Sequence, residues 1–410
     1  MNRSSFGDLP YEVQTMVISH VTQHDLASCI RVCKAWNKMT YPFLWRHIQD
    51  PQRTSHYGDD DDDDDEEDDG RYRPLPKEVI VYHPYGKGVI ACARSGALKR
   101  NGHLVKSIRI ESDMLHWSSF LQDCPPTFPR LTSLWIDGVE DHDEPDYSER
   151  LDYRDAGDDR DDCDGGDGKY LAQLLDRCSA GLRVFSFSPR LDSDRWSYTI
   201  GDKIVEALLK HAATLEVVRI GGDYACDWRH IDRLLCSLPK LKEIDFEFNC
   251  LTNRGGRLEV TAVADSDWVC LDLEVFGCAI KGIPRPEIPR TPIIDGKVRQ
   301  GTREESLDLQ RRVYTKLAKL TKLRELRLSS ELDEWTDEYR KINKKHIWQY
   351  DCLSMTLESG LDVLKDLRDL RLVVLWYLEN GISNAEETKW VQTNWPQVEI
   401  RFKKFYQRRR

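Results

Sequence analysis

Apolar residues recur at helical spacing through the first forty-five residues of the chain. The first run follows Pro10, a residue suited to the first turn of a helix because its missing N–H costs nothing there. The three apolar stripes are, in order, Val13, Val17, Ile18 and Val21; Leu26, Cys29, Ile30, Cys33 and Trp36, with Val32 beside them; and Phe43, Leu44 and Trp45 after Pro42. The pattern predicts a module of three short helices within residues 1–50.

Three short helices bury too little apolar surface to form a stable core by themselves. The predicted module must therefore be covered, either by another protein or by the rest of this chain. In the first case its apolar faces form a docking surface, and in the second they form the core of a helical cap. The apolar pattern leaves both interpretations open.

A different pattern fills residues 75–410: an apolar residue, two further residues, an apolar residue, one residue, and an apolar residue. Its copies read VKSIRI at 105, LTSLWI at 131, LRVFSF at 182, LEVVRI at 215, LKEIDF at 241, WVCLDL at 268, LRELRL at 323, LRDLRL at 367 and WPQVEI at 395. Helical patterns such as DKIVEALLKHA lie between them, and the shorter intervals approach the period of leucine-rich repeats. We expect an α/β fold: an irregular leucine-rich-repeat solenoid with a parallel sheet on its concave face and helices on its convex face. The alternative is a generic α/β domain with coincidental strands.

Composition and charge divide the chain further. Residues 51–74 include eleven consecutive acidic residues at 59–69. We expect them to form an acidic disordered linker, which is either held extended by self-repulsion or bound to a basic partner. The repeats are interrupted at 137–168, which is acidic, at 281–305, which holds four prolines, and at 329–345, which is polar. Since the two acidic segments carry net charges of −11 and −12 in a chain of net charge −11, the other residues sum to +12.

The N-terminal pattern resembles the F-box family. The matching residues are Leu9-Pro10, Glu12-Val13, Ile18, Val21, Asp25-Leu26, Val32-Cys33, Trp36 and Leu44-Trp45, in order and without a gap. The resemblance implies docking to a Skp-type adaptor and, through it, to a cullin. The residues it assigns to the adaptor are Leu9, Pro10, Val13, Ile18, Val21, Leu26, Val32, Cys33 and Trp36. The last repeats resemble those of fungal F-box proteins that carry leucine-rich repeats.

Alternate residues of each predicted strand face away from the core and offer a surface for a client protein. Two such rungs are acidic in the middle of the array and carry arginine at both ends. From this surface we select Arg109, Trp135, Arg219, Asp245, Asp272, Arg327 and Arg371. The arginines would suit a phosphorylated client, whereas the alternative is that these are ordinary polar strand positions.

Several classes of function find no support in the sequence. Residues 158–168 lack the order of ligands of a calcium-binding loop, no paired CxxC occurs among the 12 cysteines, and no nucleophile motif or phosphate-binding glycine loop is visible. We therefore expect no catalytic residues, no metal and no cofactor. We also expect no membrane and no nucleic acid among its ligands, and we expect free thiols in a cytoplasmic or nuclear protein.

The resemblance to the F-box family, together with the predicted repeats, implies a substrate-recognition subunit of a Skp–cullin–F-box ubiquitin ligase, which supplies proximity and does no chemistry itself. The alternative is an F-box scaffold outside the ligase, which binds basic partners through its acidic segments. A hydrolase hidden in the irregular repeats ranks third, because no nucleophile–base pair is apparent.

Overall fold

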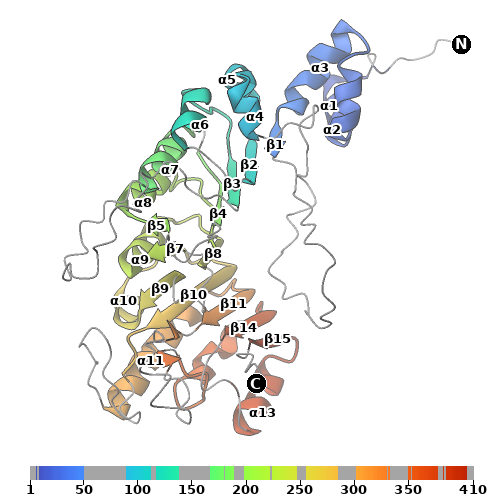
Figure 1. Ribbon diagram of the computed structural model, residues 1–410. Helices are drawn as coiled ribbons and strands as arrows, with labels where there is room; N and C mark the ends of the chain where they lie inside the picture. The colour runs from blue at the N-terminus through green and yellow to red at the C-terminus, as the bar shows by residue number, and fades with distance from the viewer. Residues whose placement is uncertain are drawn as a thin grey trace, which may run out of the picture. The chain divides into compact units, whose positions relative to one another are not determined.

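The computed structural model describes the chain as two compact units. The first is Met1–Asp146 with Arg177–Ala180, and the second is Tyr147–Asp176 with Gly181–Arg410 (Figure 1). The described residues are 6, 9–49, 89–111, 117–137, 167–179, 181–188, 198–221, 224–246, 255–284, 302–329, 331–332, 350–351, 353–376, 382 and 385–403. The acidic run at 59–69 and most of the three insertions lie outside them, so what we expect of those segments stays a prediction.

The first unit begins with three helices: α1 (Tyr11–Ser19), α2 (Gln23–Cys29) and α3 (Lys34–Leu44). Thr22 caps α2 by accepting the Asp25 N–H. The second and third helices differ in extent from the prediction. The predicted stripe from Leu26 to Trp36 is divided, because Cys33 is extended and α3 begins after it, and Pro42 lies inside α3 instead of starting a new helix.

The helices lead directly into a parallel sheet. Strand β1 (His47–Gln49) pairs with β2 (Ser107–Glu111), which pairs with β3 (Ser133–Asp137). The unit also contains α4 (Val89–Arg94), α5 (Ala97–Asn101), the 3-10 turn η2 (Gly102–Leu104) and α6 (Trp117–Asp123). The Tyr41 hydroxyl donates to Asn101 Oδ1 over 3.0 Å, so the helical module also contacts α5. The predicted domain boundary at residue 50 therefore follows a strand that is already part of the sheet.

The second unit repeats strand and helix in chain order. Its elements are α7 (Asp167–Asp176), β4 (Val184–Ser188), β5 (Tyr198–Ile200), α8 (Asp202–Leu209), β6 (Val217–Ile220), β7 (Tyr224–Cys226), α9 (Trp228–Ser237), β8 (Glu243–Phe246), β9 (Gly255–Glu259), α10 (Val260–Asp265), β10 (Val275–Lys281), α11 (Arg303–Ala318), β11 (Glu325–Ser329), β12 (Glu331–Leu332), β13 (Tyr350–Asp351), the 3-10 helix η5 (Leu361–Asp366), β14 (Leu372–Trp376), α13 (Ala385–Asn394) and β15 (Glu399–Lys403).

Neighbouring strands of this sheet are parallel, in the order β4-β6-β8-β10-β11-β14-β15. Short strands β5, β7 and β9 form a second parallel ladder, which joins the sheet where β9 pairs with β10. Helices α8 to α11 lie along one face of the sheet (Figure 1). The expectation of a mixed α/β fold with a parallel sheet is confirmed.

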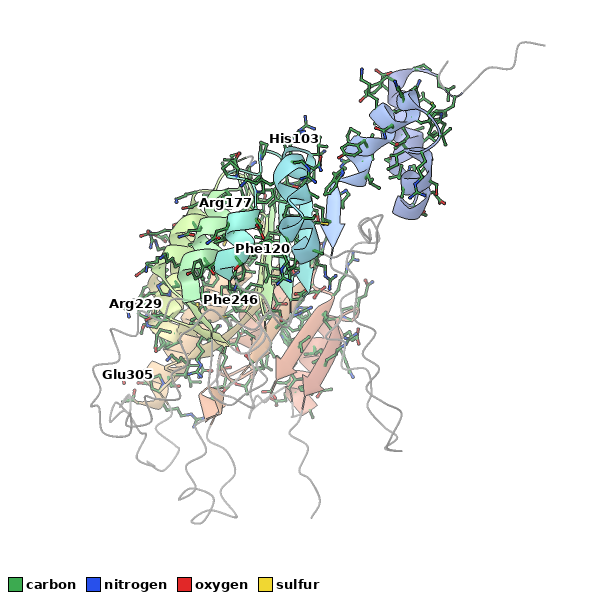
Figure 2. The ribbon with its side chains drawn as sticks, turned by 45° about the horizontal axis from the view of Figure 1, so that its top comes forward. His103, Phe120, Arg177, Arg229, Phe246 and Glu305 are labelled. Carbon is green, nitrogen blue, oxygen red and sulfur yellow. The ribbon has the colours of Figure 1, made fainter. Side chains whose placement is uncertain are left out.

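The apolar positions of the repeat form the core on the helix side. Phe185, Val218, Ile244 and Leu326 are fully buried, and the residue on either side of each is more exposed or polar. Large side chains such as Phe246 fill this layer (Figure 2). At the start of α11, Glu305 and Thr302 form a capping box, in which the Thr302 N–H donates to Glu305 Oε2 over 2.7 Å.

At the amino-terminal end of the sheet, the carbonyl of the residue that precedes a strand accepts two hydrogen bonds from the start of the neighbouring strand, and these bonds set the register. The Arg183 carbonyl accepts the N–H groups of Glu216 (2.8 Å) and Val217 (3.0 Å). In the first unit the Arg46 carbonyl accepts those of Lys106 (2.7 Å) and Ser107 (3.1 Å) in the same way. Because this double hydrogen bond fixes each strand start against the next, residues just before neighbouring strands lie side by side.

Three predicted strands lie elsewhere than expected. At 268, 367 and 395 the observed strands begin at Val275, Leu372 and Glu399. In the first two cases a second apolar frame overlaps the first: Leu273, Phe276 and Cys278 in one, and Leu370, Val373 and Leu375 in the other. The chain turns at Leu271 and Asp272, so the earlier frame packs as a loop and the later one forms the strand.

Candidate functional site

The helical module of the first unit exposes an unusual number of large apolar side chains. Tyr11 is 71% exposed, Val32 67% and Met16 58%, and Leu9 and Val17 are also exposed. Of the eight large apolar side chains that are exposed among the described residues, five belong to this module, and an excess of exposed apolar surface is a mark of protein-binding sites. We refer to Leu9, Tyr11, Met16, Val17 and Val32 as the exposed apolar set.

The core of the same module takes the other apolar residues. Ile18 and Leu26 are buried, together with Leu44 and Trp45. Trp36 is half-buried because Phe6 stacks on it, with ring centroids 5.1 Å apart. The Leu9 carbonyl accepts the Gln14 side-chain amide over 2.6 Å, which holds the residues before α1 against that helix.

The nine residues predicted to contact an adaptor therefore fall into three groups. Leu9, Pro10, Val32 and Cys33 are exposed, Val13, Val21 and Trp36 are half-buried, and Ile18 and Leu26 lie in the core. The prediction omitted Tyr11, Met16 and Val17. The signal for Val17 was present in the sequence, because Val17 belongs to the first apolar stripe, and Met16 directly precedes it.

A second surface is the face of the second unit's sheet opposite to the helices, where in-register residues form ion pairs. Arg219 binds Glu243 with both ends of its guanidinium, at 2.5 Å and 2.9 Å. Burial opposes the charge of Arg219, but the hydrogen bonds and charge of Glu243, with the charge of Asp245, raise its pKa above the ordinary value. Arg219 therefore keeps its positive charge, and the carboxylate of Glu243 balances it.

Arg327 spans a strand to make its ion pairs. Its Nη1 lies 2.6 Å from Asp245 Oδ2 and its Nη2 lies 3.0 Å from Glu325 Oε2. Gly277 is the in-register residue between Asp245 and Arg327. A Cβ on Gly277 would overlap Asp245 Oδ1, so the contact across β10 depends on the missing side chain.

The other predicted client-binding residues are distributed differently. In the first unit Arg109 and Trp135 are in-register neighbours, and Arg109 lies 3.2 Å from Asp137. Asp272 is not on a strand: it lies in a turn, 2.8 Å from Lys322. Arg371 precedes β14, and its N–H donates to the Arg324 carbonyl. The placement of Asp272 and Arg371 on the strand face was wrong, because the overlapping apolar frames shifted the assumed strands; Gly277 and Val374 take those positions.

Comparison with known families now decides the nature of the helical module. Residues 6–49 match the F-box-like family model. No curated protein matches the chain. F-box domains bind Skp-type adaptors in Skp–cullin–F-box ubiquitin ligases, and F-box proteins are generally non-catalytic. The F-box-like domain therefore begins at Phe6, which stacks on Trp36, and ends with β1.

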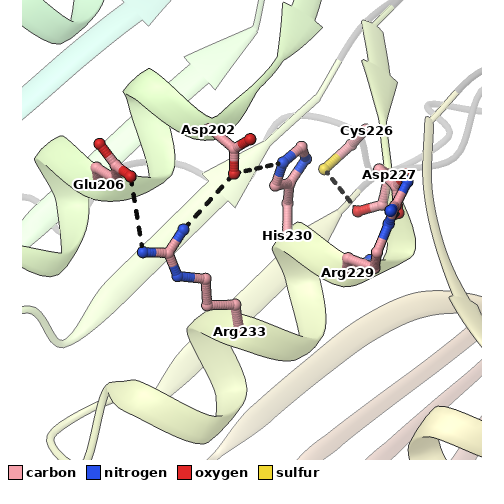
Figure 3. A network of polar contacts seen from close by, with 7 residues as sticks. All are labelled: Asp202, Glu206, Cys226, Asp227, Arg229, His230 and Arg233. Atoms are coloured by element: carbon pink, nitrogen blue, oxygen red, sulfur yellow. Dashed lines mark hydrogen bonds and ion pairs between the residues drawn. The ribbon is translucent and has the colours of Figure 1, made fainter. Parts of the chain in front are cut away.

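Among the described residues, a polar network on α8 and α9 brings together the residue types found in catalytic sites (Figure 3). His230 Nε2 lies 3.2 Å from Asp202 Oδ1, and Arg233 contacts Asp202 and Glu206. The nearby Cys226 thiol donates to the Asp227 carbonyl at 3.7 Å, and burial raises its pKa well above the ordinary value. A protonated thiol is a poor nucleophile. The ion pairs of Asp202 with His230 and Arg233 join α8 to α9.

In the part of the chain that the structure describes, no group of three or more His, Cys, Asp and Glu residues has the arrangement of a metal site. None of the helices in this part has the length and apolar character needed to cross a bilayer.

Proposed function

We propose that this chain is the substrate-recognition subunit of a Skp–cullin–F-box ubiquitin ligase. The observation that carries the proposal is the exposed apolar set, which lies within the F-box-like domain and has no covering element among the described residues. Apolar anchors on helices that enter a groove of a partner are a common mode of recognition. Burial of these side chains in the adaptor would supply the affinity.

The client would bind the repeat region. The chain-ordered succession of parallel strands and helices supports a leucine-rich-repeat solenoid of the kind found in fungal F-box proteins. Its sheet face presents Arg219, Asp245 and Arg327, whose charges are already paired within the sheet. A client must therefore match this pattern of both signs or exchange its own charges for the existing pairs. Because these arginines are already paired, they favour recognition of a phosphorylated client less than unpaired arginines would.

The chain itself would perform no chemistry and would act in the cytoplasm or nucleus. Co-purification of a cullin with the chain would separate the ligase subunit from the alternative, an F-box scaffold that binds basic proteins outside the ligase.

The direct test is a calorimetric titration of the purified full chain with a Skp-type adaptor. We expect a Kd between nanomolar and micromolar, and we expect Val32→Glu to weaken it about tenfold or more because a charge would be buried in the interface. Val269→Glu is the matched control: Val269 is 43% exposed but lies in the second unit, so binding should be unchanged. Absence of binding by folded wild-type protein, or equal effects of both variants, would overturn the proposal.

A further inference from the structure

Three cations gather at the amino-terminal end of the first unit's sheet. Arg46 comes just before β1, Lys106 just before β2, and Arg130 lies in the turn before β3. The Lys106 N–H donates to the Arg46 carbonyl over 2.7 Å, and the Thr132 N–H donates to the Lys106 carbonyl over 2.8 Å. Adjacent strands lie about 4.8 Å apart, so the backbone fixes Arg46 and Lys106 as immediate neighbours.

These cations repel one another. Burial lowers the pKa of Lys106, and the charges of Arg46 and Arg130 lower it further. Burial also lowers the pKa of His47, to about 4, with the charges of Arg46 and Lys106 as additional causes. His47 is thus neutral near pH 7 and adds no further positive charge. The three cations remain charged side chains held close together by the fold.

Among the described residues, no acidic side chain pairs with any of the three cations, and Arg46 Nε is buried without a hydrogen-bond partner. The corresponding residues of the second unit behave differently. There Glu216 lies between Arg183, at 2.7 Å, and Lys242, at 3.0 Å. This end of the sheet is therefore neutralised in the second unit, whereas the corresponding end of the first unit's own sheet is left positive.

The first unit as a whole also carries an excess of positive charge. Its described residues contain eleven Lys and Arg but five Asp and Glu, a net of +6. The acidic run at 59–69 belongs to the same unit and begins ten residues after the end of β1. A chain of ten residues spans at most about 35 Å, so a run attached there stays within reach of the rim at a high effective concentration.

We propose that Arg46, Lys106 and Arg130 form a binding site for a run of carboxylates, and that the chain's own residues 59–69 are its ligand. The eleven acidic residues offer repeated negative charges, which neighbouring cations can bind in more than one register. Because Lys and Arg at this rim are at least partly exposed, the interaction weakens as salt is raised. The site lies outside the exposed apolar set and does not depend on adaptor binding.

The test uses a fluorescent synthetic peptide with the sequence of residues 59–69, added to the full chain at low salt. In a neutralised variant, the run itself is replaced by Asn and Gln, so the site is open. We expect this variant to bind the peptide about tenfold more tightly than wild type does, because the attached run competes in wild type. Equal binding by the two proteins would show that the run does not occupy the site and would overturn the assignment of the ligand.

The site itself is tested in the neutralised background. Arg46→Gln/Lys106→Gln should weaken peptide binding about tenfold, whereas Arg368→Gln/Lys319→Gln should leave it nearly unchanged. The control pair removes one arginine and one lysine that are exposed in the second unit, so it matches the change in net charge. Equal losses would mean that the peptide responds to net charge alone, which would overturn the site.

Arg130→Glu tests the same site without the risk that the double variant loses peptide binding because it misfolds. Arg130 is exposed in a turn, so its reversal should leave the thermal melting transition unchanged and still weaken the peptide several-fold. Unchanged peptide affinity in this variant would also overturn the proposal.

Discussion

At the scale of single residues, Gly277 determines how the sheet face of the second unit carries its charges. It lies between Asp245 and Arg327, which meet at 2.6 Å across β10. The sequence could not identify this role, because the apolar pattern at 268–278 contains two overlapping frames and the first places Asp272 on the sheet. The choice between the frames depends on the turn at Leu271 and Asp272, which the period of the pattern does not specify.

Gly277→Ser should therefore destabilise the protein. The added side chain would overlap Asp245 Oδ1 and displace the ion pair with Arg327, and we expect the free energy of unfolding to fall by about 1–3 kcal/mol. Urea unfolding of the full chain measures this change. Gly201→Ser is the control: no atom lies within 4 Å of the added Cβ, and serine is a favoured N-cap for α8, so stability should be kept or raised. Equal stability of the two variants would contradict this account.

At the scale of helices and strands, a single apolar frame placed β11 correctly. LRELRL at 323 gave β11 at Glu325–Ser329, with Leu326 and Leu328 buried as expected. The helical module was harder to resolve. Helical spacing places Ile18 and Leu26 on apolar stripes and Val32 beside one. It does not show that the first two lie inside the module and the third on its surface. That division depends on how the helices pack.

The ion pairs at the rim of the second unit should make its stability depend on pH. Burial tends to raise the pKa of Glu216, but hydrogen bonds from Lys242 and Arg183 outweigh it and lower the pKa below the ordinary 4.5. A carboxyl whose pKa is lowered by folding stabilises the fold above its ordinary pKa, and that contribution is lost as the pH falls through the lower folded value. Glu216→Gln should therefore be less stable than wild type at pH 7, and the difference should shrink toward pH 3.

Urea midpoints measured from pH 7 to pH 3 would test this expectation. Glu206→Gln is a suitable control, because Glu206 is exposed and lies 3.9 Å from Arg233. Its midpoint should stay close to that of wild type at each pH. A gap between wild type and Glu216→Gln that stays constant down to pH 3 would show that the carboxylate charge is not what stabilises this rim.

At the scale of the molecule, protection should follow the position of each strand in its sheet. In the second unit, β8 is paired on both sides and Ile244 is fully buried, whereas β15 is paired with β14 alone among the described strands, and Phe402 is 48% exposed. Backbone amides open most readily where few buried contacts hold them. We expect peptides that cover 243–246 to exchange hydrogen about tenfold or more slowly than those that cover 399–403, as measured by mass spectrometry.

The same measurement with a Skp-type adaptor present would report on the F-box-like domain. Added protection should appear in peptides from residues 9–33 and should be absent from 399–403. Added protection in the repeats instead would show that the adaptor contacts the repeats, and it would contradict the proposed role of the F-box-like domain.

The close approach of Asp245 and Arg327 also constrains how this chain can diverge. Any side chain at position 277 would overlap Asp245 Oδ1 where that carboxylate meets Arg327, so a substitution of Gly277 is disfavoured for as long as this ion pair remains. Related chains that carry a larger residue at 277 should have lost the arginine at 327, the aspartate at 245, or both. The order of substitutions in the evolution of such chains would then be constrained: a larger residue replaces this glycine only after one of its neighbours has changed.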